Sequence, residues 1–374
     1  MEKYQNPACM KIKDITGVLD DFAPPALQEP YDNAGLVAGN SDNKVNSVLL
    51  CLDVTEEVVE EAYRKGAELI ISHHPVIFRK LNRLTGATYT ERILISAVRY
   101  GIALYSAHTN IDKITGGVNS RFCEKLGLKQ TRILSPVQGI MRKLVVFVPS
   151  AHAQKVREAI FSAGAGHIGE YDQCSFNVEG QGSFRGSEHS DPFAGKAGVL
   201  HFENEVRVET IYPLYLEGRI LKKMVGSHPY EEVAYDIYPL DNEYNKAGLG
   251  MIGYLDKPLA VTEFLKLLKN TFQTGVIRHS SFTGSKMISS VAVCGGSGAS
   301  LIPAARKTDA DIYVSGDIKY HDFFDADDNM MIADIGHFES ERFTLDIFYE
   351  LLRKKFPNFA VHFSEVNTNP IHYF

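Results

Sequence analysis

The residues VNSVLLCLDVTEEVVEEAYRKGAELIISHHP, at positions 45–75, decide the fold. An apolar run ending at Asp53 is followed by a helical stretch and then by a second apolar run ending in His73 and His74. Thr55 is well placed to cap the helix, and the glutamates after it suit the positive first turn. Two buried strands joined by a helix predict a right-handed crossover within a parallel sheet.

The alternation of apolar strand-like runs and helical stretches continues along the chain and resumes after a middle region with a different pattern. A helical period over 92–100 precedes an apolar strand over 101–112, and further strands at 290–296, 311–317 and 330–337 follow after residue 250. The pattern predicts an α/β domain with a mostly parallel sheet. Ligand groups in such sheets gather at the carboxyl ends of the strands, so we expect the polar strand ends to meet at one sheet.

The middle region predicts a separate domain. Short β-leaning runs and two helical stretches between 143 and 240 follow a βαββαβ order, which is typical of ferredoxin-like α+β domains. We therefore predict a split α/β domain formed by 1–127 and 244–374, interrupted by an inserted domain over 128–243.

Composition limits the classes of function. The 374 residues are 44% hydrophobic and 23% charged, as in ordinary folded proteins, and the formal net charge of −7 argues against a broad basic surface for nucleic acid. No apolar stretch approaches the roughly 20 residues of a membrane helix. The odd set of widely spaced cysteines predicts reduced thiols in a cytoplasmic protein; they are Cys9, Cys51, Cys123, Cys174 and Cys294.

Two groups of candidate metal ligands follow strands of the first half. His73 and His74 project to opposite sides of their strand end, so each can serve a different ion; the alternative is a turn with two solvated imidazoles. Asp112 suits a carboxylate that bridges two cations, although alone it also suits a helix cap. His108 is either a further ligand or a group that orients Asp112.

The third group lies in ADIGHFESERF, residues 333–343. A helix that starts near His337 places Glu341 one turn away on the same face, and this helical phase favours Glu341 over Glu339 as the ligand. Histidine and carboxylate without thiolate suit Zn, Fe, Mn or Co. Three such groups at strand ends together predict a metal site.

Several other polar groups have two interpretations each. Asp32 and Asn33 either reach the site or form a turn. Asp317 and His321 either act as an acid or base near the cavity or cap the next helix. The glycines at 295–298 either cradle an anion or form a turn, and His228 is interpreted as packed or at an oligomer contact.

The motifs resemble those of the NGG-one-interacting-factor-three family, whose bacterial members are labelled GTP cyclohydrolase I type-two homologues or dinuclear metal centre proteins. The resemblance rests on the outer segments and on six motifs: YDNAGL at 31–36, LDVT at 52–55, ISHHP at 71–75, SAHTNID at 106–112, GDIKYHD at 316–322 and GHFESE at 336–341. The insert, through 166–176 and 227–240, resembles the divalent-cation-tolerance and PII-like trimeric proteins.

The resemblance implies two divalent metal ions in a cavity, with Zn expected first and Fe or Mn as alternatives, in a homohexameric ring with trimeric contacts through the insert. By this resemblance the metal positions are His73, His74, Asp112, His337 and Glu341.

Two hypotheses about function follow. In the first, the protein is a metal-dependent hydrolase that activates water between two cations, with His108 or His321 shuttling protons and a nucleotide such as GTP, attacked at C8, as the substrate. In the second, the metals organise a ring that serves as a scaffold or regulatory interaction protein, and the insert senses a small molecule or a partner.

Overall fold

The computed structural model describes residues 10–282, 286–326 and 330–374. The chain divides into two compact units: one combines the segments up to Pro136 and from Asn245 onward, and the other comprises Val137–Tyr244. The predicted α/β class with an inserted domain is confirmed.

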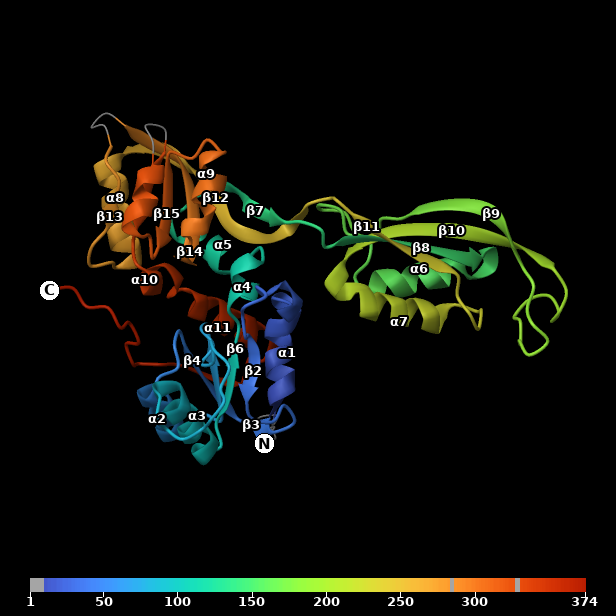
Figure 1. Cartoon of the computed structure of the whole chain (residues 1–374), viewed down its shortest axis with the longest axis horizontal. Helices are drawn as coiled ribbons and strands as arrows, with labels where there is room; N and C mark the ends of the chain where they lie inside the picture. The colour runs from blue at the N-terminus through green and yellow to red at the C-terminus, as the bar shows by residue number, and fades with distance from the viewer. Residues whose placement is uncertain (1–9, 283–285, 327–329) are drawn as a thin grey trace, which may run out of the picture. The chain divides into compact units, whose positions relative to one another are not determined.

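The first unit holds a five-stranded sheet in the order β17-β4-β5-β6-β2 (Figure 1). β17, β4, β5 and β6 run parallel, and β2 is antiparallel to β6. Helices α2 and α3 pack on one face, and α1 and α11 pack on the other. The bounds are β2 Gly35–Ala38, β4 Ser47–Cys51, β5 Leu69–Ser72, β6 Ala103–Ser106, β17 Ala360–Phe363, α1 Ile12–Phe22, α2 Glu56–Lys65, α3 Tyr89–Tyr100 and α11 Thr344–Lys355.

The opening crossover forms as the sequence predicts. The Thr55 side chain accepts a hydrogen bond from the backbone N–H of Val58, and Gly66 ends α2 in the left-handed conformation. A short pair of strands, β1 (Met10–Lys11) and β3 (Lys44–Val45), lies at the start of the described chain.

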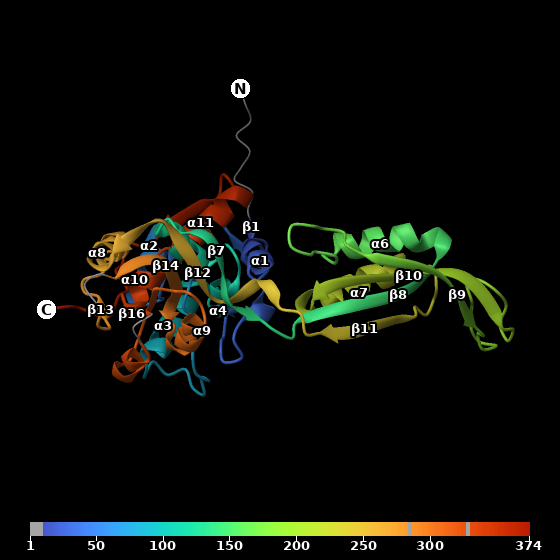
Figure 2. The same ribbon diagram turned by 90° about the horizontal axis from the view of Figure 1, so that it is seen from above.

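A second sheet of the same unit has the order β13-β16-β15-β14-β12-β7. β14, β15 and β16 are parallel, whereas β12 and β13 pair in the antiparallel sense. Helices α5 and α8 cover one face, and α9 covers the other. Figure 2 shows α8 and α9 on opposite sides of β14. The bounds are β7 Lys129–Val137, β12 Tyr244–Ala260, β13 Arg278–His279, β14 Met287–Ser297, β15 Ile312–Gly316, β16 Met331–Asp334, α5 Val118–Lys125, α8 Val261–Phe272 and α9 Ile302–Arg306.

The expectation that all polar strand ends belong to one sheet is wrong. β5 and β6, which lead to the first two candidate groups, lie in the five-stranded sheet, while β16 lies in the six-stranded sheet. Two short helices carry ligands beyond the strands: α4 (Thr109–Lys113) follows β6, and α10 (His337–Glu341) follows β16.

The second unit has the predicted βαββαβ order, formed by β8, α6, β9, β10, α7 and β11. Its sheet order is β11-β8-β10-β9, and both helices pack on one face of the sheet over Leu144, Val146 and Val208. The bounds are β8 Met141–Pro149, α6 Ala153–Ser162, β9 Phe176–Phe184, β10 His201–Pro213, α7 Glu217–Ser227 and β11 Tyr235–Leu240.

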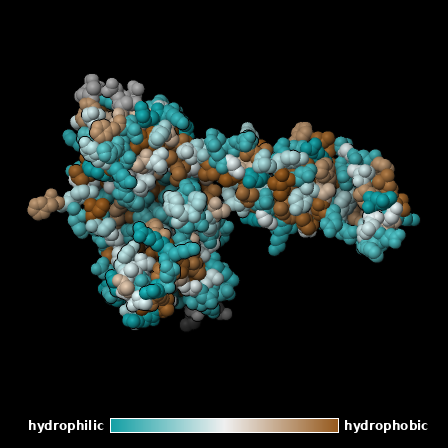
Figure 3. All heavy atoms as spheres, viewed as in Figure 1, coloured by the Kyte–Doolittle hydropathy of each residue, from teal (hydrophilic) through white to brown (hydrophobic). Residues whose placement is uncertain are grey.

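No helix among the described residues is long and apolar enough to cross a membrane. The face seen in Figure 3 mixes hydrophilic and hydrophobic side chains. Four cysteines, Cys51, Cys123, Cys174 and Cys294, are free thiols, and Cys9 lies outside the described residues.

Candidate metal centre

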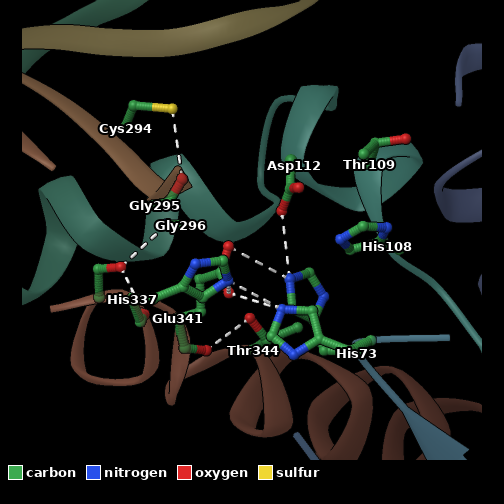
Figure 4. A network of polar contacts seen from close by, with 12 residues as sticks. His73, His108, Thr109, Asp112, Cys294, Gly295, Gly296, His337, Glu341 and Thr344 are labelled. Carbon is green, nitrogen blue, oxygen red and sulfur yellow. Dashed lines mark hydrogen bonds and ion pairs between the residues drawn. The ribbon is translucent and has the colours of Figure 1, made fainter. Parts of the chain in front are cut away.

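Local structure at the ends of three strands brings the candidate ligands together. His73 and His74 directly follow β5, and their backbone N–H groups donate to Cys51 and Leu52 of the neighbouring strand's end. Asp112 lies in α4. His337 and Glu341 are the first and last residues of α10, so both project from one face of a single turn (Figure 4).

Three overlapping sets of side chains converge at this point. They are His73 with Asp112 and Glu341, His74 with His337 and Glu341, and His73 with His74 and His108; within each set the ligand atoms lie within 4.8 Å of one another. The five predicted metal ligands and His108 therefore form one cluster, although they come from both sheets of the unit.

Each of the four imidazoles is held through its Nδ1 atom. Nδ1 of His73 lies 3.0 Å from the Ala107 carbonyl, and Nδ1 of His74 lies 2.8 Å from Asp53. Nδ1 of His108 lies 2.9 Å from Asp32, and Nδ1 of His337 lies 2.7 Å from Asp317. An acceptor at Nδ1 requires the proton there, so each neutral ring presents a lone pair on Nε2.

The Nε2 atoms point at other acceptors. Nε2 of His74 and Nε2 of His337 lie 3.0 and 3.1 Å from Glu341 Oε2, and 3.2 Å from each other. Nε2 of His73 lies 3.5 Å from Glu341 Oε1 and 3.6 Å from Asp112 Oδ1. Lone pairs that face lone pairs repel one another unless a cation or a proton lies between them.

Two of these atoms are buried without any hydrogen-bond partner among the described residues: His73 Nε2 and Asp112 Oδ1. Buried polar atoms are almost always paired, because an unpaired one costs about 1–3 kcal/mol. Imidazole and carboxylate are both ligands of divalent transition metals, so the residues present fit a metal centre.

The carboxylate of Glu341 lies between two groups of candidate ligands. Its Oε1 faces His73 and its Oε2 faces His74 and His337, so one side chain reaches both groups of ligands. Asp112 belongs only to the group that contains His73. Asp112 lies in α4, with Oδ1 3.6 Å from His73 Nε2, and its role as a bridging carboxylate stays a prediction.

Burial and charge in the metal-free cluster shift the pKa values of three of its groups. Burial lowers the pKa of His337, but the charge of Glu341 and the hydrogen bond to Asp317 outweigh it and raise that pKa to about 11. Burial and the charge of Glu341 raise the pKa of Asp112 to about 8. Burial also raises the pKa of Glu341, yet His73 and His337 hold it well below its usual range.

The glycine turn at 295–298 makes room for Glu341. Gly296 has φ +66°, and a Cβ placed there would lie 2.2 Å from Glu341 Oε1. The N–H groups of Gly295 and Gly296 already donate to Asn119 and Ser340. The turn therefore serves close approach to the cluster, and these two N–H groups are not free to cradle an anion.

The structure also separates the remaining candidates. Asp32 holds His108 and Asp317 holds His337, whereas Asn33 donates through Nδ2 to the carbonyl of Ile77, 44 positions away. His321 is exposed on the 3-10 helix Tyr320–Asp325 and is absent from the described residues that line the cavity. Its ring packs beside Tyr320 and Phe324, and its role as a proton shuttle stays a prediction.

Two further candidates, His228 of the insert and Glu339 of α10, make other contacts. His228 is packed, with Nε2 3.0 Å from the Phe147 carbonyl. Glu339 is buried and accepts a hydrogen bond from Asn369, so it takes no part in the cluster and the preference for Glu341 agrees with the geometry.

Sequence reasoning missed two supporting residues. Asp53 ends the strand β4 region and accepts from His74 Nδ1, and Thr368 Oγ1 donates to the other oxygen of Asp53 at 2.9 Å. A polar residue after an apolar run was a usable signal for Asp53. Thr368 lies in an irregular C-terminal segment whose sequence carries no comparable signal.

The cluster lies in a cavity of about 530 Å³. Tyr31, Phe78, Leu301 and Ile371 contribute apolar surface, and carboxylates, serines and the C-terminal segment contribute polar surface. An open cavity above a histidine and carboxylate cluster leaves space for a substrate beside the ligands.

Fold and site together define an α/β protein with an inserted ferredoxin-like unit and residues able to hold metal at the meeting point of two sheets. The chain belongs to the Duf34/NIF3 (NGG1p interacting factor 3) family, whose model matches residues 10–370. The resemblance seen in the sequence motifs is thereby confirmed.

Relatives and solved structures agree over nearly the whole chain. A Halalkalibacterium halodurans protein named GTP cyclohydrolase 1 type 2 homolog is 42% identical over 86% of this chain and 87% of its own length. A Bacillus subtilis protein of the same name is 38% identical over 96% of this chain and 97% of its own. The crystal structure of a Bacillus cereus protein related to NIF3 matches with a TM-score of 0.84 and 37% identity, covering 98% of this chain and 100% of the other.

Proposed function

We propose that this protein is a hydrolase that depends on a dinuclear metal centre. The observation that carries the proposal is the convergence of Nε2 lone pairs and carboxylate oxygens on one point, with His73 Nε2 and Asp112 Oδ1 buried and unpaired among the described residues. Two divalent cations held there supply an acidified water and stabilise negative charge that develops on a substrate.

His73, His74, Asp112, His337 and Glu341 would hold the metal, with Glu341 Oε2 beside His74 and His337 and Oε1 beside His73. Asp53 and Asp317 fix the orientation of two of these imidazoles through Nδ1. Such carboxylate–histidine pairs also raise the basicity of the coordinating nitrogen.

His108 is the residue that we propose for proton transfer. It lines the cavity, its ring centroid lies 5.3 Å from those of His73 and His74, and Asp32 holds its Nδ1 atom. This arrangement leaves Nε2 to accept a proton from water and to return it to a leaving group. Asp32 keeps the ring in one tautomer and stabilises the imidazolium form.

Ring opening of a purine, with water added at C8, is one reaction of this type. The relatives named GTP cyclohydrolase 1 type 2 homolog support a nucleotide or a related compound as the substrate. We also propose zinc as the metal, with iron or manganese as alternatives, because the ligand set contains no thiolate. A homohexameric ring with trimeric contacts through the insert and a cytoplasmic location complete the proposal, on the strength of the family resemblance.

Elemental analysis of the purified protein and of two matched variants tests the metal centre. Glu341→Gln and Glu339→Gln change two buried carboxylates of the same short helix. We expect wild type and Glu339→Gln to hold two ions per chain, and Glu341→Gln to lose at least one of them.

A hydrolysis screen with the restored metal tests the activity. Nucleosides, nucleotides, phosphoesters and peptides cover the electrophilic carbon and phosphorus centres that such a site attacks. Metal-replete protein that is inert towards all of them would refute the hydrolase proposal. If Glu341→Gln then dissociates the oligomer, the metals serve a scaffold.

A further inference from the structure

The cavity above the cluster contains no lysine or arginine among the described residues that line it, and its basic side chains are those of the cluster, His74, His108 and His337. Five carboxylates line it: Glu29, Asp53, Asp112, Asp317 and Glu341. A nearby cation, Lys113, is already committed, because its Nζ lies 2.8 Å from Glu29 and its side chain is only 11% exposed. Two divalent cations would at most neutralise the four remaining carboxylates.

This charge pattern does not suit a triphosphate. Sites that hold the phosphates of nucleoside triphosphates combine lysine or arginine with free backbone N–H groups. The glycine turn beside the cluster does not supply such a cradle, since Gly295 and Gly296 donate their N–H groups within the protein. Three or four further negative charges would enter a cavity that has nothing to balance them.

The cavity is well suited to a flat ring. Tyr31 and Phe78 both line it, and they keep 76% and 58% of their surface exposed, which is unusual for large aromatic side chains. Exposed aromatic rings at the edge of a cavity offer stacking surfaces for a planar heterocycle. Ser297, Ser300 and Asn369 add hydroxyl and amide groups that can pair with the polar edge of such a ring.

We infer that the site takes an uncharged planar nitrogen heterocycle, as a free base or a nucleoside, and discriminates against the corresponding triphosphate. This inference rests on the proposed hydrolase function and narrows its substrate class. Tyr31 and Phe78 stack on the ring, and the carboxylate-rich wall repels phosphate groups.

Binding measurements on the full-length, metal-loaded protein test the inference with guanosine, GMP and GTP as probes. We expect the dissociation constant to increase with each added phosphate and to be at least about tenfold higher for GTP than for guanosine. Tyr31→Ala and Phe78→Ala should each weaken guanosine binding about tenfold. Tyr89→Ala, which removes another exposed ring that is absent from the cavity lining, should leave it unchanged.

A variant that introduces a positive charge into the cavity should favour binding of the triphosphate. Ser300 is exposed and lines the cavity, so Ser300→Lys should strengthen GTP binding about tenfold and leave guanosine binding unchanged. Tighter binding of GTP than of guanosine by the wild type, or no binding of guanosine by metal-replete protein, would overturn the inference. Elemental analysis of the same samples separates this failure from that of the metal centre, because the proposed function fails if the protein binds no metal.

Discussion

Substitution of Gly296 by alanine tests the centre without changing any ligand. The new Cβ would lie 2.2 Å from Glu341 Oε1, well inside contact distance, so the carboxylate has to move away from His73. Because Oε1 is the end of a flexible side chain, this movement itself costs little folding energy. The positive φ of +66° adds about 1–2 kcal/mol for any residue with a Cβ.

Gly66→Ala supplies a matched control. Gly66 has φ +69°, and a Cβ there would meet nothing within 4 Å. Both variants should therefore lose a similar free energy of unfolding in urea titrations, about 1–2 kcal/mol. Only Gly296→Ala should lose metal, with affinity in chelator competition lowered at least about tenfold, the effect typical of disturbed metal ligation. Retention of metal at wild-type affinity in Gly296→Ala would refute the proposal that Glu341 is a metal ligand.

Three further outcomes follow from the contacts of the cluster. Thr368→Val removes the hydroxyl that holds Asp53, so chelator competition should show metal affinity lowered up to about tenfold; unchanged affinity would rule out a role for the C-terminal segment. His108→Gln should reduce turnover at least about a hundredfold while elemental analysis still finds both ions, and metal loss would instead make His108 a ligand. Burial lowers the pKa of His74, but hydrogen bonds to Asp53 and Glu341 outweigh it and raise this pKa from 6.5 to about 9. Protonation of His74 therefore stabilises the metal-free fold fully below pH 6.5, and this stabilisation is lost as the pH rises through about 9. The melting temperature of metal-free protein should fall between pH 7 and pH 10 more than that of the metal-loaded protein; equal slopes would contradict the shift.

Local signals in the sequence were enough to predict many of the elements. Apolar runs that end in polar residues predicted β4, β5, β6 and β16, and turn and cap residues predicted α2. The βαββαβ order of the insert was equally readable, because each of its strands and helices is short and separately patterned.

The partition of strands between two sheets was not predictable in the same way. A buried strand is apolar on both faces whichever sheet it joins, so its period does not identify its neighbour. β12, which spans Tyr244–Ala260 and pairs with β14, contains several glycines and charged residues that weaken its strand pattern. The sequence therefore did not show that β16, which leads to His337 and Glu341, belongs to a second sheet.

The candidate site was predictable in its members but not in their roles. Recognisable sequence positions are occupied by His73, His74, Asp112, His337 and Glu341. The orientation of Glu341 towards His73, His74 and His337 depends on the space left by Gly296, which no local pattern shows. The contact between Thr368 and Asp53 joins residues 315 positions apart, which no local pattern can indicate.

His74 and Glu341 are 267 positions apart in the chain, and the whole inserted unit lies between them. A nascent chain that has produced the insert holds His73, His74, His108 and Asp112, so a truncation before β16 leaves these four residues without His337 and Glu341. Metal bound by the complete chain would cross-link the two outer segments and would close a loop whose entropy cost grows only slowly with its length. Such a cross-link would allow the inserted unit to be enlarged, shortened or exchanged without altering the metal centre that the two outer segments form.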